Sequence, residues 1–119
     1  MSKNGLRRNC RKLWGRHPRF DATLDYWDDF VDDYSVRLTR GERLHVRFAA
    51  RWSNAKVGLT LWRPQTKSVH GVKRRVAGTA RPGKTQRLAY RAPHTGWYEV
   101  RLRIEHQGGG RYALDLTKS

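Results

Sequence analysis

The stretch Tyr90–Ile104, Y-R-A-P-H-T-G-W-Y-E-V-R-L-R-I, decides how the rest of the chain is interpreted. Pro93 fixes φ and removes a backbone donor, and Gly96 can take the positive φ that a tight turn needs. After this turn, apolar and polar side chains alternate up to residue 104, which is typical of a strand with one face on a core and the other in water. The pattern predicts Val100 inward and Arg101 outward. Val100→Asp should therefore unfold the domain and Arg101→Asp should be tolerated.

Weaker versions of the same alternation recur along the chain. Further strands are predicted within residues 19–27, 34–39, 43–48, 56–62, 72–80, 88–90 and 111–117. The segment 28–33 is expected to be an acidic turn, 63–83 a long loop around the weak strand at 72–80, and 107–110 a flexible glycine turn. Short strands separated by turns predict an all-β fold, an antiparallel, jelly-roll-like β-sandwich of seven to eight strands with no substantial helix.

The length of 119 residues predicts one domain. We expect residues 1–17 to be a disordered basic arm and 18–119 to form the sandwich; the arm could alternatively contact nucleic acid or a membrane surface. No apolar run is long enough to span a bilayer. The N-terminus lacks an apolar stretch, so no signal peptide is expected in this chain, and an extracellular location would require a longer exported protein.

The chain carries 26 Lys and Arg against 10 Asp and Glu, a formal charge of +16. A surplus of this size predicts affinity for polyanions such as nucleic acid, anionic glycans or membrane headgroups. It could equally reflect an arginine-rich source organism. Both interpretations remain open at the level of sequence.

Four motifs in order resemble the bacterial pre-peptidase C-terminal (PPC) domain. They are D-D-F-V-D-D-Y-S-V-R-L-T-R-G-E-R-L-H-V at 28–46, V-G-L-T-L-W-R-P at 57–64, Y-R-A-P-H-T-G-W-Y-E-V at 90–100 and G-G-G-R-Y-A-L-D-L at 108–116. The resemblance covers roughly residues 20–117. It implies a non-catalytic accessory domain attached in cis to a secreted subtilisin-like peptidase or other hydrolase. The role implied is support of export or stability, or weak binding of substrate.

The acidic segment is the one candidate cation site. Asp28, Asp29, Asp32 and Asp33 could supply the oxygen ligands that Ca²⁺ prefers, and some relatives in the resembled family bind calcium near this end. The spacing does not match an EF-hand loop. The alternative is that these carboxylates pair with arginines and cap turns. No other cofactor is predicted.

Outward positions on the predicted strands carry many arginines and two tryptophans. The candidate polyanion-binding residues are Arg37, Arg43, Arg47, Arg87, Arg91, Arg101, Arg103, Trp62 and Trp97. Phosphate or carboxylate contacts combined with ring stacking would bind nucleic acid or an anionic polysaccharide, and such binding by a free-standing basic module is the alternative to the accessory role. The other interpretation is a solvated sheet face whose arginine stems cover the tryptophan rings.

Catalysis has little support in the sequence. Cys10 is the single cysteine, and no His, Cys or carboxylate spacing matches a metal centre or a nucleophile–base pair. We therefore predict that the chain is not an enzyme.

Overall fold

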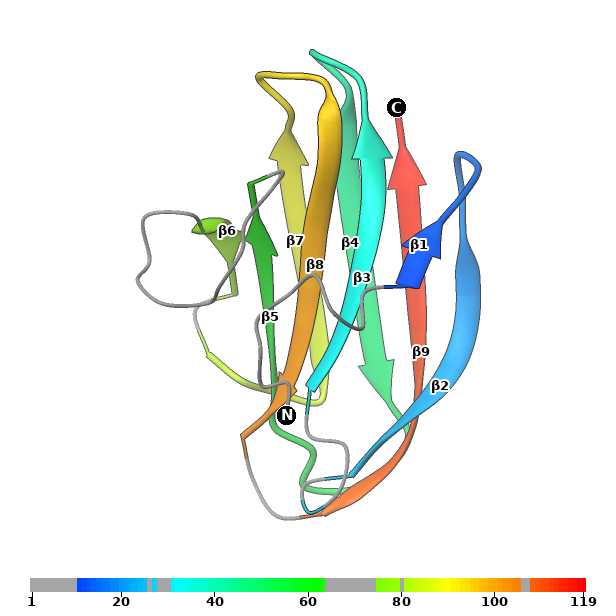
Figure 1. Cartoon of the computed structure of the whole chain (residues 1–119). Helices are drawn as coiled ribbons and strands as arrows, with labels where there is room; N and C mark the ends of the chain where they lie inside the picture. The colour runs from blue at the N-terminus through cyan, green and yellow to red at the C-terminus, as the bar shows by residue number, and fades with distance from the viewer. Residues whose placement is uncertain (1–10, 26, 28–30, 64–74, 80, 106–107) are drawn as a thin grey trace.

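Two β-sheets packed face to face make up the molecule (Figure 1). The computed structural model describes residues 11–25, 27, 31–63, 75–79, 81–105 and 108–119. These residues contain nine strands and no helix. The predicted all-β sandwich is therefore confirmed, with nine strands where seven to eight were expected.

Each sheet mixes strands from distant parts of the sequence, and every pair is antiparallel except β1–β3. The five-stranded sheet contains, in spatial order, β1 (Arg11–Leu13), β3 (Val31–Leu38), β8 (Gly96–Ile104), β5 (Val57–Trp62) and β6 (Arg75–Gly78). The four-stranded sheet contains β2 (Arg19–Asp25), β9 (Gly109–Lys118), β4 (Arg43–Ala50) and β7 (Thr85–Arg91).

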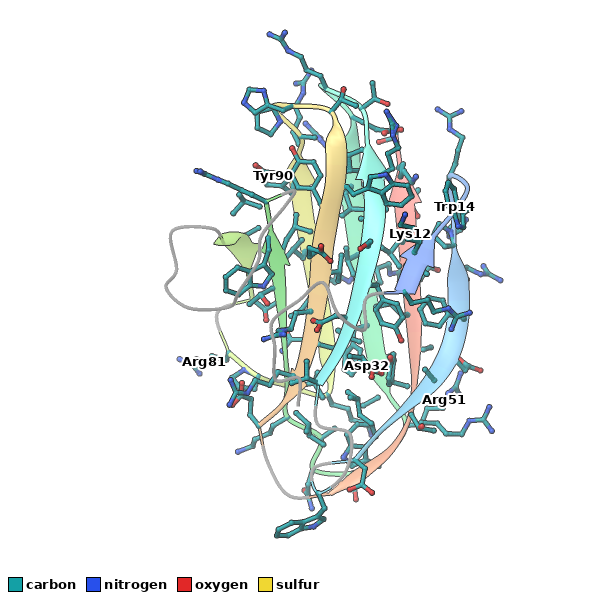
Figure 2. The ribbon with its side chains drawn as sticks, viewed as in Figure 1. Lys12, Trp14, Asp32, Arg51, Arg81 and Tyr90 are labelled. Carbon is teal, nitrogen blue, oxygen red and sulfur yellow. The ribbon has the colours of Figure 1, made fainter. Side chains whose placement is uncertain are left out.

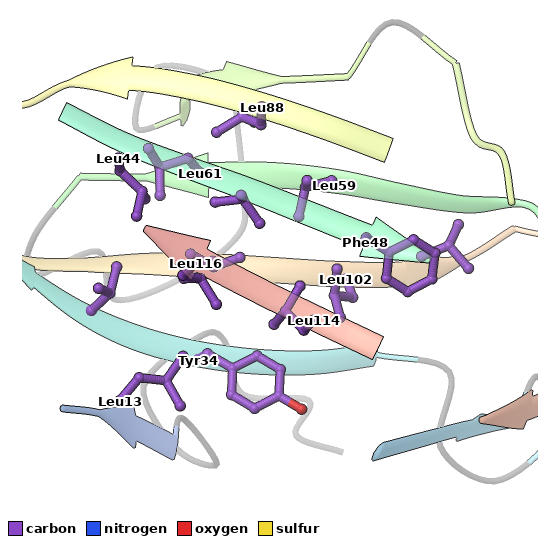
Figure 3. Close-up of a cluster of buried hydrophobic side chains, with 14 of the residues drawn as sticks. Leu13, Tyr34, Leu44, Phe48, Leu59, Leu61, Leu88, Leu102, Leu114 and Leu116 are labelled. Atoms are coloured by element: carbon purple, nitrogen blue, oxygen red, sulfur yellow. The ribbon is translucent and has the colours of Figure 1, made fainter. Parts of the chain in front are cut away.

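The core lies between the sheets and follows from the period-2 pattern. Strand β8 occupies the middle of its sheet, paired with β3 on one side and β5 on the other. Its inward side chains Tyr98, Val100, Leu102 and Ile104 are at most 2% exposed. They meet leucines and aromatics of β4 and β9 from the opposite sheet (Figure 3). The stretch that dominated the sequence thus forms the centre of the fold.

The turns match the sequence only in part. Gly41, between β3 and β4, has φ +87°, as its predicted turn requires. Gly96 does not have a positive φ and is instead the first residue of β8. The predicted flexible turn at 107–110 is also wrong in its second half, because Gly109 and Gly110 begin β9. A Cβ on Gly109 would lie 2.6 Å from the Leu24 carbonyl oxygen, so this glycine permits close strand contact.

The N-terminal segment departs most from expectation. Arg11–Leu13 forms β1 and pairs in parallel with β3, so the prediction of a disordered arm is wrong for this part of residues 1–17. Leu13 is 5% exposed in the core, and the Arg11 guanidinium lies 5.2 Å from the centroid of the Phe20 ring. Two hydrogen bonds, from the Leu116 amide to the Pro18 carbonyl and from the Lys118 amide to the Arg16 carbonyl, fix the following turn onto β9.

Two further boundaries bear on the candidate sites. The weak strand predicted at 72–80 is present as β6, at Arg75–Gly78. Strand β3 starts at Val31, inside the segment predicted as an acidic turn. No helix long and apolar enough to cross a membrane occurs among the described residues.

Candidate binding surfaces

The outward face of the five-stranded sheet holds polar side chains that are buried and paired. Ser35 and Glu99 lie opposite each other on β3 and β8, both 5% exposed, and the Ser35 hydroxyl donates to Glu99 Oε2 at 3.0 Å. One row along, Arg101 donates to both carboxylate oxygens of Asp33, at 2.8 and 3.1 Å. Burial raises the pKa of Asp33, and the charge and hydrogen bonds of Arg101 offset this rise in part.

Asp32 and Asp33 point to opposite faces of β3, because successive side chains of a strand alternate. Asp32 accepts a hydrogen bond of 2.6 Å from the Tyr112 hydroxyl of the other sheet, while Asp33 binds Arg101. The two carboxylates are thus directed away from each other. Asp28 and Asp29, the other members of the predicted calcium site, lie outside the described residues. No group of three or more His, Cys, Asp or Glu side chains suited to a metal occurs among the residues described. Calcium binding stays a prediction.

The Asp32 contact belongs to a hydrogen-bonded chain that links the two sheets. Each phenol has one proton to donate. The Tyr112 hydroxyl donates its proton to Asp32, so in the hydrogen bond between the two tyrosines the Tyr34 hydroxyl donates and the Tyr112 oxygen accepts. Tyr112 is fully buried. Burial, the charge of Asp32 and these hydrogen bonds raise the pKa of Tyr112 far above its ordinary range. The phenol is therefore neutral in the folded protein, which suits a structural role.

Three of the predicted polyanion-binding residues have other contacts in the structure. The exposed ring predicted for Trp62 is wrong, since this residue is 6% exposed and its Nε1 donates to Thr60 Oγ1 at 2.9 Å. The β5–β6 pairing shifts register between Leu61 and Trp62, and both side chains are buried there. Arg101 is paired with Asp33, and Arg103 Nε lies 3.9 Å from Glu105 Oε2.

Four others come together on the outward face of the four-stranded sheet. Arg43 of β4 lies directly opposite Arg91 of β7, and Arg47 lies opposite Arg87. All four are exposed. We call this set the arginine face. Within the described part of the chain, no carboxylate lies within 4.0 Å of any of the four guanidinium groups. Like charges directly opposite each other destabilise a sheet. On its other side Arg47 lies opposite Asp115 of β9, whose carboxylate is bound by His17. An anionic ligand would reduce the repulsion that remains.

A shallow, open depression of about 430 Å³ lies beside the Arg47–Arg87 pair. Its lining includes His45, Arg47, Arg87 and Ala89. His45 and Ala89 are opposite each other in the intervening row, and the methyl group of Ala89 leaves the space open. Along each strand the two pairs are about 14 Å apart, from four residues at roughly 3.4 Å each.

The remaining pair, Arg37 and Trp97, lies elsewhere, opposite each other on β3 and β8. Two residues that were predicted to belong to the disordered arm lie beside Trp97. Trp14 contacts Trp97 edge-on, with centroids 5.0 Å apart and planes at 79°. Lys12 Nζ lies 5.1 Å from the Trp97 centroid. Figure 2 shows Lys12 and Trp14 together beside β1. Leu13 and Trp14 are both apolar, so this short stretch before Gly15 shows no alternation that would have predicted a strand.

Comparison with solved structures identifies the fold. The pre-peptidase C-terminal domain of a collagenase from Bacillus anthracis matches with a TM-score of 0.71 and 14% identity, over 91% of this chain and 94% of that one. PliG from Aeromonas hydrophila, a periplasmic inhibitor of g-type lysozyme, matches with a TM-score of 0.73 and 10% identity, over 93% and 96%. PliG from Salmonella Typhimurium matches with a TM-score of 0.59 and 14% identity, over 93% and 99%.

No protein-family model matches the chain, and no curated protein matches it in sequence. At identities this low, the structural likeness establishes the fold alone. It confirms the fold expected from the PPC resemblance. It also shows that the same sandwich is used by free inhibitor proteins and by a domain of a larger enzyme.

Proposed function

We propose that this chain is a non-catalytic accessory domain that acts in cis beside an exported hydrolase and supports its folding or stability. The supporting observation is that nearly the whole chain has the fold of a collagenase's pre-peptidase C-terminal domain. Two sheets closed over one apolar core form an independent unit that can pack beside a catalytic domain without contributing to its active site. The periplasmic PliG inhibitors of the same fold favour a location outside the cytoplasm.

The test is to fuse the chain to the C-terminus of a secreted bacterial subtilisin-like peptidase. We expect a higher yield of exported, active peptidase, or slower thermal inactivation, than with the peptidase alone. The matched control is the same fusion carrying Val100→Asp, because a charge at this fully buried position disrupts the core. Equal yield and equal inactivation in all three proteins would count against the accessory role.

A second function is favoured by the arginine face. Four exposed arginines in two cross-strand rows would bind an extended polyanion through contacts to its charged groups. Such binding weakens steeply with salt, because binding releases counterions. We expect Arg47→Gln with Arg87→Gln to weaken heparin binding and to flatten its salt dependence. Arg81→Gln with Arg103→Gln, at exposed positions outside this sheet face, is the control, and equal losses in both variants would exclude this face as the site.

A further inference from the structure

A second surface lies at the end of β3, which has β1 on one side and β8 on the other and is contacted there by the end of β9. We call it the seam patch and define it by Lys12, Trp14, Arg37, Trp97 and Lys118. These residues come from four separate strands and the turn after β1. Contacts connect them: Trp14 and Lys12 to Trp97, Arg37 opposite Trp97, and Lys118 Nζ to the Arg37 carbonyl oxygen at 3.0 Å. Only the folded chain brings this set together.

The two indoles of the seam patch differ in their exposure to solvent. Trp97 is half-buried, and Lys12 lies near its ring. Trp14 is 70% exposed, so most of its ring surface faces solvent. Tryptophan is on average a highly buried residue, and exposed tryptophans concentrate where a protein binds something. The geometry therefore offers one exposed aromatic surface, on Trp14, which is in edge-to-face contact with Trp97.

The three cations of the seam patch lie beside Trp97 and the end of β3: Lys12 is near the Trp97 ring, Arg37 is opposite Trp97, and Lys118 donates to the Arg37 carbonyl. Lys12, Arg37 and Lys118 have no carboxylate within 4.0 Å in the described structure. Asp115, on the same strand as Lys118, is held by His17 Nε2 at 2.7 Å. Two contacting indoles next to three positive charges, none of which has a carboxylate within 4.0 Å among the described residues, are complementary to a flat, partly apolar group that carries negative charge.

We propose that the seam patch binds an acidic polysaccharide, with the apolar C–H face of one pyranose ring against Trp14 and a carboxylate or sulfate near Lys12, Arg37 and Lys118. Proteins that bind single-stranded nucleic acid stack successive bases on several rings. Here the two indole planes are nearly perpendicular, so one ring at most can stack. This favours a sugar over consecutive bases. The inference goes beyond the accessory role and uses none of the four residues of the arginine face.

The test measures binding of polygalacturonate to the full chain at low salt by isothermal calorimetry and tryptophan fluorescence. Trp14→Ala is expected to weaken binding at least fivefold, and Trp14→Phe to retain part of it. Trp27→Ala is the matched control, because Trp27 is also 70% exposed but follows β2 at the far end of β9, where its amide donates to Asp25. Dextran, a neutral polymer, should not bind.

Three outcomes would overturn the proposal, provided circular dichroism shows each variant folded. The first is equal affinity of Trp14→Ala and Trp27→Ala. The second is oligothymidylate binding that is tighter than polygalacturonate binding and lost in Trp14→Ala, which would assign the patch to single-stranded nucleic acid. The third is loss of polygalacturonate binding in Arg47→Gln with Arg87→Gln but not in Trp14→Ala, which would assign the polymer to the arginine face.

Discussion

The outward faces of the two sheets carry charged residues in opposite circumstances. On the five-stranded sheet, the β3–β8 pair aligns Asp33 with Arg101 and Ser35 with Glu99, and these groups are largely buried and hydrogen-bonded to each other. On the four-stranded sheet, the β4–β7 pair aligns arginine with arginine twice. All four side chains are exposed, and none has a carboxylate within 4.0 Å among the residues that the structure describes.

This difference indicates which charges the fold depends on. A buried ion pair that loses one partner leaves an uncompensated charge in a poorly solvated place. An exposed arginine that is removed loses little, because water already solvates it. The paired face should therefore respond to substitution with lost stability, and the arginine face with lost ligand binding.

The largest expected effect comes from Arg101→Asp. It would place a second carboxylate beside Asp33 at a position where the arginine side chain is 13% exposed, and breaking a buried pair in this way costs about 3–5 kcal/mol. The sequence alone predicted tolerance here, because an outward strand position was equated with an exposed one. Equilibrium urea unfolding measures the effect. Arg87→Asp, on the exposed face, is the control and should change stability by less than about 1 kcal/mol.

Equal midpoints for these two variants would contradict the comparison, because they would mean that the Asp33–Arg101 pair contributes nothing. If instead both variants unfold, the arginine face would have a structural role that its exposure does not suggest.

A smaller effect is expected from Tyr112→Phe, which removes the hydrogen bond to Asp32 between the sheets. Leaving a buried acceptor without its donor costs about 1–3 kcal/mol near pH 8. The pKa of Tyr112 is raised in the folded state, so above about pH 10 the unfolded chain loses this proton while the folded chain keeps it. The free energy of unfolding of the wild type should therefore fall as the pH rises above about 10. The difference in unfolding free energy between the wild type and Tyr112→Phe should become smaller over the same range. Urea unfolding measures this difference, and an equal difference at pH 8 and pH 11 would contradict the prediction.

The sequence predicted the interior of this molecule better than its surfaces. Val100 was placed correctly, since alternation over five or more residues determines which side chains enter the core. Alternation separates only inward from outward. Alternation does not show which residue lies opposite on the neighbouring strand, nor whether other side chains cover the outward face. For this reason Trp62 and Arg101 were wrongly expected to be exposed.

The candidate surfaces depend on strand pairing, which one sequence does not reveal. Nothing local indicates that Arg47 faces Arg87, which is 40 positions away, or that Trp14 meets Trp97. Strand β1 was missed because three residues carry too little periodicity, and its stability comes from pairing with β3 and from burial of Leu13. This missed strand supplies Lys12 and leads into Trp14, the two residues that distinguish the seam patch.

The smallest expected effect, and the most direct test of the comparison, is a gain in stability from Arg87→Glu. The change replaces the like-charged pair Arg47–Arg87 with a pair of opposite charges at the same cross-strand distance. Cross-strand charge pairs contribute about 0.2–1 kcal/mol, so the urea midpoint should rise slightly. The rise should shrink at 1 M salt, where the screening length falls to about 3 Å. Arg81→Glu changes the net charge equally at an exposed position outside the arginine face and controls for relief of overall repulsion. If both variants gain the same amount, the general positive charge of the chain is responsible. If only Arg87→Glu gains stability and the same variant binds heparin more weakly, the arginines of this face lower the stability of the fold and at the same time bind the anionic ligand.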